Sequence, residues 1–356
     1  MDIAHYRRSE ALAQQIAPSW RHAEAHRPHV FLERGFPVRV DSSADLFQLL
    51  DTMQEARFEA YQRELGGLSA DDVDVVVDAL CAYCEFFARH FHANRCALPL
   101  ATMLAHYVLY TKLRRWPRHA DILEIGPGCG YLTFFLRRHP GLASYAQTES
   151  TESFYILQNL VADHCFGAAF VEHAAIDPVA MRALAMPAPF VPADTSTEVV
   201  MPSQARCHHW PWWRIAELAA LRFDLVTSNA NLNEMSHEAV RHYTQIIGTA
   251  LHPDGAVVVQ DPGGGPLPWS AIVDCFREAG LSPALIYAKG ADAIPGRDLA
   301  TPTVVFTRAG AADVAAAKRL FEVPSVPRRL YSGAELGALV TARLRAGDGA
   351  ATGSAA

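Results

Sequence analysis

The stretch Asp121-Ile-Leu-Glu-Ile-Gly-Pro-Gly-Cys-Gly-Tyr-Leu-Thr133 carries the strongest structural signal in the chain. Its first half is a short apolar run typical of a buried strand, and its second half is a turn that contains Gly126, Gly128 and Gly130. Glycine permits a tight turn and lets a ligand lie against bare backbone. A helical segment follows and ends at Pro140-Gly141. This order predicts a ligand-binding crevice at the carboxyl end of a parallel strand.

Downstream of this turn the chain alternates short apolar runs with segments of helical periodicity. Such alternation predicts a parallel, doubly wound α/β sheet with helices on both faces. The last two runs are close enough in the sequence to pair as an antiparallel hairpin at one edge. The seven runs that we interpret as strands are residues 121–125, 144–148, 169–172, 223–228, 256–260, 283–287 and 303–306.

Three zones divide the 356 residues. Residues 1–116 are predicted to be a helical N-terminal region that covers the substrate side or forms a homodimer contact. Residues 117–310 hold the predicted sheet, with a Pro-rich, irregular insertion at 186–213. Residues 311–356 are expected to form a helical arm and, after Arg345, a flexible tail of low sequence complexity.

The composition excludes several classes of protein. A hydrophobic share of 50% and a charged share of 19% supply a full core and exclude a disordered chain. A formal net charge of -7 disfavours general binding to nucleic acid or to an anionic membrane. The N-terminus lacks the apolar core of a signal peptide, and seven scattered cysteines suit reduced thiols. We therefore expect a cytoplasmic protein that acts on a small molecule.

The spacing of the glycines discriminates between nucleotide cofactors. A dinucleotide-binding fingerprint reads G-x-G-x-x-G, whereas here the third glycine comes one residue early. Tyr131 also occupies a position that the fingerprint keeps small. Glu124 stands two residues before Gly126, where a carboxylate that points into the crevice would repel a phosphate and attract a cation. The turn therefore disfavours an NAD-dependent oxidoreductase.

The pattern E-x-G-x-G-x-G at residues 124–130 resembles the first motif of class I S-adenosylmethionine (SAM) methyltransferases. The resemblance implies SAM as the cofactor and a Rossmann-like, seven-stranded methyltransferase core. It also implies that Gly126, Gly128 and Gly130 hold the amino-acid end of SAM, with Glu124 helping directly or indirectly at the ammonium group.

A ribose contact gives a second test of this interpretation. An adenosine ribose needs an acidic acceptor at the end of the next strand, about 20 residues further on. Glu149 meets this condition at the end of the predicted strand 144–148, and Glu152 is the alternative acceptor. The competing interpretation is an ordinary turn beside a surface carboxylate.

Polar residues also crowd the end of the fourth predicted strand. Asn229, Asn231 and Asn233 follow this strand, at the point that faces the transferred methyl group in a methyltransferase. The resemblance implies that Asn229 contacts the cofactor, while Asn231 and Asn233 contact the substrate. Alternatively, these side chains cap and position the helix that follows.

Methyl transfer to a hydroxyl needs two aligned reactants and a base for the proton. His237 is our first choice, since histidine is the usual base near neutral pH, and Glu234 and Asp261 are next. No clean metal-ligand spacing surrounds His237 and Asp261, and Cys81-x-x-Cys84 lies on a strongly apolar helical stretch. We therefore expect no metal.

The predicted insertion ends in the aromatic run His208-His209-Trp210-Pro211-Trp212-Trp213. Aromatic faces suit the apolar face of a sugar or a flat ring, so His209 and Trp212 are candidate substrate contacts. A lid segment packed on the core is the alternative.

The pattern N-x-x-L-x-E-M at residues 229–235 is similar to bacterial sugar O-methyltransferases, and the resemblance to methyltransferases covers about residues 105–262. It implies a SAM-dependent methyltransferase that acts on a small polar hydroxyl compound, either sugar-like or a natural-product intermediate. Two alternatives stay open. The same cofactor loop can serve cyclisation or aminocarboxypropyl transfer, which release methylthioadenosine, or it can belong to a non-catalytic subunit that binds a partner.

Overall fold

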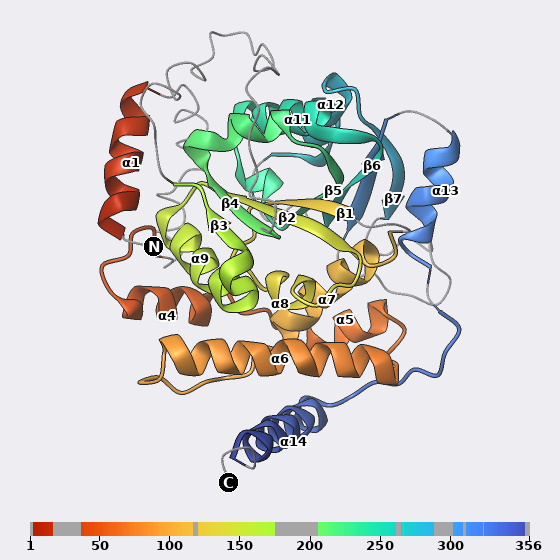
Figure 1. The fold of residues 1–356 in the computed structure, drawn as a ribbon. Helices are drawn as coiled ribbons and strands as arrows, with labels where there is room; N and C mark the ends of the chain where they lie inside the picture. The colour runs from red at the N-terminus through yellow and green to blue at the C-terminus, as the bar shows by residue number, and fades with distance from the viewer. Residues whose placement is uncertain are drawn as a thin grey trace.

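The computed structural model shows one sheet with helices on both of its faces (Figure 1). Asp261 and residues 186–205 of the predicted insertion lie outside the described residues. The structure describes residues 3–16, 37–116, 120–174, 206–260, 265, 267–287, 302–308, 311–322 and 324–352.

The strand order is β3-β4-β2-β1-β5-β6-β8-β7. Neighbouring strands are parallel except at β8, which runs antiparallel to both β6 and β7, so the antiparallel pairing expected at the edge is confirmed. The doubly wound α/β class is confirmed as well, with eight strands among the described residues instead of seven. The strands are β1 Ala120–Ile125, β2 Leu142–Glu149, β3 Phe170–Glu172, β4 Cys207–Pro211, β5 Phe223–Asn229, β6 Leu251–Gln260, β7 Ser282–Tyr287 and β8 Thr303–Thr307.

Helices cover both faces of this sheet (Figure 1). The α-helices are α1 Ile3–Ile16, α4 Ser43–Thr52, α5 Phe58–Glu64, α6 Ala70–His90, α7 Leu100–Leu113, α8 Thr133–Leu136, α9 Glu152–Phe166, α11 His237–Ala250, α12 Trp269–Glu278, α13 Ala311–Arg319 and α14 Gly333–Thr352. The 3₁₀ helices are η1 Gly167–Ala169, η2 Trp212–Ala220 and η3 Leu232–Glu234.

Two apolar cores lie on opposite faces of the sheet. Ile122 of β1 packs into a core with α6, α7, α8 and α9, whereas Leu123 packs into a core with η2, α11 and α12. Successive residues of a strand point to opposite faces, so one buried strand supplies both cores. Figure 1 shows α6 outside α7 and α8, with α14 beyond α6.

β1 lies between β2 and β5, so the chain first builds one half of the sheet and then returns to build the other. Ile125 at the end of β1 is in register with Thr148 of β2 and with Ser228 of β5. The carboxyl ends of these three strands therefore meet at one edge. In open α/β sheets this reversal point is where ligands bind.

The eighth strand corrects our prediction of an irregular insertion up to residue 213. Residues Cys207–Pro211 form β4, which is buried throughout and pairs with β2. The strand predicted at 169–172 becomes the short edge strand β3 beside it. Histidines hid the apolar pattern of β4, because their polar rings are buried by stacking. The ring of His209, for example, lies 4.0 Å from that of Tyr155 between centroids.

The C-terminal prediction also needs a correction. α14 continues to Thr352, so part of the low-complexity tail expected to be flexible is helical. The alanines of this stretch favour a helix, whereas its glycines disfavour one. The prediction of a flexible tail rested on the glycines and neglected the alanines. No helix in the described part of the chain is both long and apolar enough to cross a membrane.

Candidate functional site

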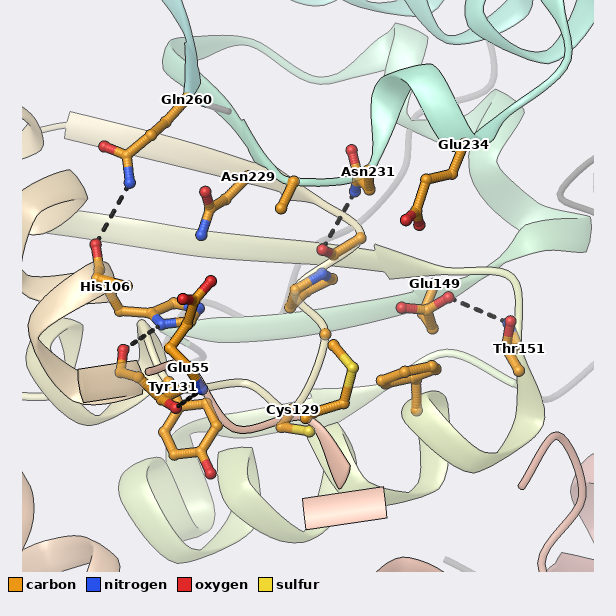
Figure 2. Close-up of a pocket in the computed structure, with 18 of the residues that line it drawn as sticks. Glu55, His106, Cys129, Tyr131, Glu149, Thr151, Asn229, Asn231, Glu234 and Gln260 are labelled. Atoms are coloured by element: carbon orange, nitrogen blue, oxygen red, sulfur yellow. Dashed lines mark hydrogen bonds between the residues drawn. The ribbon is translucent and has the colours of Figure 1, made fainter. Parts of the chain in front are cut away.

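A cavity of about 350 Å³ lies at the edge where the strand order reverses. One wall is formed by the glycine turn after β1 and by the ends of β2, β5 and β6. The other wall is formed by α7 and by the connection between α4 and α5. Figure 2 shows the two walls facing each other. Both zones separated in the sequence, the helical region and the sheet, therefore contribute to one site.

The glycine turn adopts backbone conformations that favour glycine. Gly126, Gly128 and Gly130 have φ angles of +64°, +59° and +76°. Gly126 and Gly128 line the cavity, as we predicted for cofactor contacts. Gly130 does not line it, because this residue faces α9, where an added β-carbon would lie 3.6 Å from Val161. Gly130 therefore shapes the turn without facing the ligand space.

Asn231 holds the glycine turn against β5. Its amide nitrogen donates to the carbonyl oxygens of Ile125 at 2.7 Å and Gly126 at 3.2 Å, and its amide oxygen accepts a hydrogen bond from the Ser228 hydroxyl. Asn231 also lines the cavity. It therefore positions the turn, and the substrate contact that we expect of it stays a prediction.

Glu149 closes the far end of the cavity, where Figure 2 shows it beside Thr151. Its Oε1 accepts hydrogen bonds from the backbone nitrogens of Ser150 at 2.7 Å and Thr151 at 3.1 Å. Its Oε2 accepts from Gln158, whose amide also donates to the Gly128 carbonyl oxygen. Burial raises the pKa of Glu149, and these hydrogen bonds oppose that rise. A fixed carboxylate thus faces the cavity where we predicted an acceptor for a ribose.

Glu124 does not point into the cavity, so of the two roles that we expected, direct or indirect help at the ammonium group, only the indirect one is compatible with its position. It lies on the α8–α9 side of β1, is 1% exposed, and accepts a hydrogen bond from the Tyr145 hydroxyl. Burial raises the pKa of Glu124 to about 7, against the opposing effect of that hydrogen bond. Glu124 also does not belong to the cavity lining, so any influence on a ligand acts through the strand and turn that it supports.

Asn229 and Gln260 mark the opposite end of the cavity from Glu149. They end β5 and β6, and both line the cavity (Figure 2). Ala230 follows with a φ of +57°, a strained value for a residue with a β-carbon. Glu234 of η3 also lines the cavity, and its catalytic role stays a prediction.

His106 of α7 is a cavity residue that the sequence did not single out. Its Nδ1 lies 2.9 Å from the carbonyl oxygen of Thr102, which can only accept, so Nδ1 carries the proton and Nε2 keeps a lone pair. Burial lowers the pKa of His106, although the hydrogen bond to Thr102 opposes this. The ring is therefore neutral and able to accept a proton at neutral pH.

The wall opposite the sheet is built from residues that local patterns did not mark as functional. Gln54 donates to the Tyr131 hydroxyl at 3.1 Å and accepts from the Thr102 hydroxyl at 3.1 Å. Glu55 pairs with Arg57 at 2.8 Å. All five residues line the cavity. Of these residues, only Tyr131 was marked in the sequence, by its unusual position directly after the glycine turn.

Several predicted site residues lie elsewhere. His237 is exposed in the first turn of α11 and does not line the cavity. Asn233 instead fixes a neighbouring loop, since its side chain accepts from the Gly265 nitrogen at 2.9 Å. His209 and Trp212 are buried in or next to the sheet, without contact to the cavity. Asp261 lies outside the described residues.

Metal ligands do not gather in the part of the chain that the structure describes: it contains no group of three or more His, Cys, Asp or Glu side chains placed to hold an ion. What the cavity offers instead is a glycine turn, a fixed carboxylate at one end and a neutral imidazole towards the other. Such a site can bind a polar nucleoside-like ligand and can accept a proton from a second molecule.

No family model matches the chain, and no curated protein matches it. Among solved structures, the chain is similar to a TehB-like SAM-dependent methyltransferase from Corynebacterium glutamicum, with a TM-score of 0.35 and 14% identity over 64% of this chain and 96% of that one. It is also similar to magnesium protoporphyrin IX methyltransferase from Synechocystis PCC 6803 with bound S-adenosylhomocysteine (SAH), with a TM-score of 0.35 and 10% identity over 67% of this chain and 100% of that one.

Proposed function

We propose that the protein is a SAM-dependent methyltransferase whose acceptor is a small polar hydroxyl compound. The observation that carries this proposal is the position of Glu149, a fixed carboxylate that faces the cavity next to the glycine turn. A carboxylate in this position suits the two hydroxyls of a ribose, and bare glycine backbone suits the chain that extends from it.

The order of the strands indicates how SAM would be oriented in the cavity. β2, β1, β5 and β6 are neighbours in that order, so Glu149, the glycine turn, Asn229 and Gln260 follow one another along the edge. The nucleoside end belongs at Glu149 and the amino-acid end at Gly126 and Gly128. The acceptor then belongs near Asn229 and Gln260.

Bound SAM would supply a methyl group activated by the neighbouring sulfonium. The chain has to hold the acceptor oxygen in line with that group and to remove the hydroxyl proton. His106 is suited to the second task, because Thr102 fixes its tautomer and leaves Nε2 as the proton acceptor. Glu234 is the second candidate base, since it lines the same cavity.

The chemistry of the lining supports a polar acceptor. Asn229 brings an amide group to the end of the cavity that we assign to the acceptor, and the polar groups of Gln260 and Thr102 lie beside it with hydrogen bonds to Lys112 and Gln54. Such groups hydrogen-bond to the several hydroxyls of a sugar or of a hydroxylated natural-product intermediate. Tyr61 and Tyr131 add aromatic faces against which a ring can lie.

Calorimetric titration with SAM and with SAH is the experiment that tests the cofactor. We expect both to bind, and mass analysis after incubation with SAM alone should show SAM unchanged. A screen of sugars and hydroxylated small molecules should then show SAH and a methylated product. Methylthioadenosine in place of SAH would point to cyclisation or aminocarboxypropyl transfer. Binding that gives no product with any acceptor would favour a non-catalytic subunit, and no binding at all would reject the cofactor assignment.

A further inference from the structure

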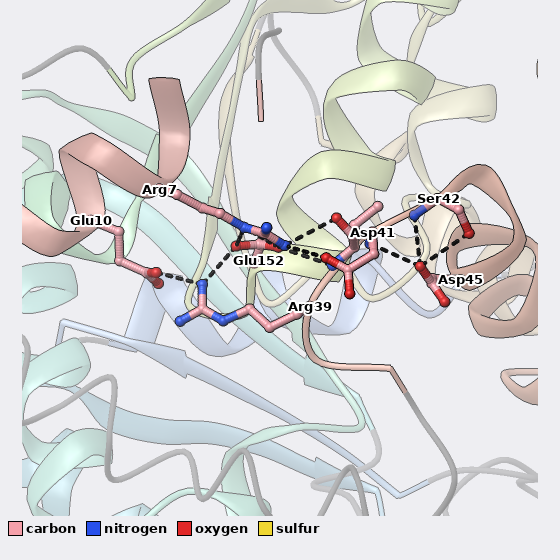
Figure 3. A network of polar contacts seen from close by, with 8 residues as sticks. Arg7, Glu10, Arg39, Asp41, Ser42, Asp45 and Glu152 are labelled. Carbon is pink, nitrogen blue, oxygen red and sulfur yellow. Dashed lines mark hydrogen bonds and ion pairs between the residues drawn. The ribbon is translucent and has the colours of Figure 1, made fainter. Parts of the chain in front are cut away.

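Glu152 is a buried carboxylate that joins three separate parts of the chain (Figure 3). It is the first residue of α9, and its side chain is fully buried. Arg7 of α1 donates to it at 2.8 and 3.0 Å, and Arg39 donates at 2.6 Å. The Val40 nitrogen adds a backbone hydrogen bond at 2.9 Å.

The same two arginines tie the N-terminal segments to each other. Arg39 also pairs with Glu10 of α1 at 2.5 Å, and Arg7 also donates to the Val40 carbonyl oxygen at 3.0 Å. Burial alone would raise the pKa of Glu152, but the hydrogen bonds from Arg7, the Val40 nitrogen and Arg39 keep it below its usual value. The carboxylate is therefore ionised, and both arginines are needed to compensate its burial.

Glu152 is connected to both walls of the cavity. On one side, Thr148, Glu149, Ser150 and Thr151 precede it directly, and all four line the cavity. On the other side, Glu152 binds the segment that contains Arg39 and Val40. This segment leads through Ser42 into α4. The end of α4 and the connection to α5 line the opposite wall of the cavity. Glu152 itself does not line the cavity.

We propose that Glu152 is a positioning residue that couples docking of the N-terminal segment, residues 3–16 and 37–41, to binding of the nucleoside end of the cofactor. This inference rests on the proposed function, because it takes SAM or SAH as the ligand. When Arg7 and Arg39 hold Glu152, the turn before α9 presents Glu149 to the cavity, and α4 is held over it. When the ion pairs are lost, both walls lose a common anchor.

Coupling of this kind is reciprocal. If docking of the N-terminal segment raises the affinity for SAH, then SAH must stabilise the docked segment by the same factor. α1 makes no contact with the cavity, so a change there on ligand addition reports the coupling and not direct contact. Tyr6 of α1, which packs on Tyr155 of α9 at 5.1 Å, places the helix next to the coupled element.

The test compares Glu152→Gln with Glu217→Gln by calorimetric titration with SAH. Glu217 is a matched control, because it is a buried glutamate that pairs with Arg214 at 2.5 Å and does not line the cavity. We expect Glu152→Gln to weaken SAH binding about tenfold and Glu217→Gln to leave the affinity unchanged. Equal affinities for Glu152→Gln and the unaltered protein, both folded by circular dichroism, would overturn the proposal.

Hydrogen exchange of the unaltered protein supplies a test that needs no variant. SAH should slow exchange of the amides in residues 3–16, and the slowing should be absent in Glu152→Gln. If SAH binds and exchange in this segment does not change, the coupling is refuted while the proposed function stands. If the unaltered protein fails to bind SAM and SAH, the methyltransferase assignment itself is refuted, and the coupling with it.

Discussion

The side-chain amide of Asn231 occupies the space that a β-carbon on Gly126 would need. A β-carbon built on Gly126 would lie 1.9 Å from the Asn231 Nδ2, which donates to the carbonyl oxygens of Ile125 and Gly126. Gly126 and Asn231 are therefore packed against each other and depend on each other. The need for glycine at 126 comes from this contact as well as from its positive φ angle.

We therefore expect Gly126→Ala to destabilise the site by more than the strain of a positive φ angle alone. Strain at the positive φ angle and the clash with Asn231 together should lower the free energy of unfolding by about 3 kcal/mol. Binding of SAH should be lost, because Asn231 must leave the turn. Denaturant unfolding and calorimetric titration measure the two effects.

Gly280→Ala is the matched control for that prediction. Gly280 has a φ of +78°, but an added β-carbon there would meet no atom within 4 Å. We expect a loss of about 1 kcal/mol from backbone strain and an unchanged affinity for SAH. Equal effects of the two substitutions would show that the Asn231 contact does not matter.

His106→Asn should separate turnover from cofactor binding. Loss of the proton acceptor is expected to lower kcat by about 10²-fold to 10³-fold once an acceptor is known, because general-base catalysis contributes that much. The affinity for SAH should change little. His237→Ala serves as the control, since His237 is exposed and outside the cavity, and it should keep full activity. The opposite pattern would restore His237 as the base.

The pH dependence of turnover gives an independent test of the same residue. Burial lowers the pKa of His106 below the ordinary value of 6.5. The neutral, proton-accepting form therefore persists into mildly acidic solution, and kcat/KM should begin to fall only below pH 6.5. A profile that falls already above pH 7 would exclude His106 as the base.

Local sequence patterns predicted the glycine turn and most of the sheet, because each depends on neighbouring residues. Gly126 and Gly128 line the cavity, and Glu149 ends β2 as the spacing required. β4 was missed because burial of His208 and His209 depends on rings that other segments supply. The stacking of His209 on Tyr155 is one such long-range contact.

The wall opposite the sheet could not be predicted in the same way. His106 and Gln54 reach the cavity only because α7 and the α4–α5 connection pack over the sheet. Neither residue stands in a local pattern that differs from an ordinary helix or loop. Glu124 shows the converse, since its spacing suggested a contact whereas the alternation of β1 turns it towards Tyr145.

Glu149→Gln should weaken cofactor binding, and it should also lower the free energy of unfolding, because the new amide nitrogen cannot accept the hydrogen bond from Gln158. The substitution keeps the shape of the side chain and removes the charge that we expect to accept hydrogen bonds from a ribose. Hydrogen bonds to charged groups suggest a loss of about 2 kcal/mol in the free energy of SAH binding. Glu124→Gln is the control, because Glu124 is buried in the same sheet and does not line the cavity. Unchanged binding in Glu149→Gln would move the ribose contact elsewhere.

Glu124 should make the stability of the protein depend on pH. Burial raises its pKa in the folded protein to about 7 from an ordinary value of 4.5. Between these values the folded protein holds a proton that the unfolded chain has lost, so the free energy of unfolding falls as the pH rises through this window. The shift corresponds to about 3 kcal/mol. Glu124→Gln, which does not titrate, should lack this contribution.

Denaturant unfolding of both proteins at pH 5 and pH 8 isolates the contribution, because every other titrating group is common to them. The unaltered protein should lose about 3 kcal/mol relative to Glu124→Gln over this range. Tyr145→Phe removes the hydrogen bond that lowers the pKa of Glu124, so it should extend the loss to higher pH. Parallel stability profiles for the unaltered protein and Glu124→Gln would mean that Glu124 is ionised in the folded state throughout, as a direct partner of a cationic ligand would have to be.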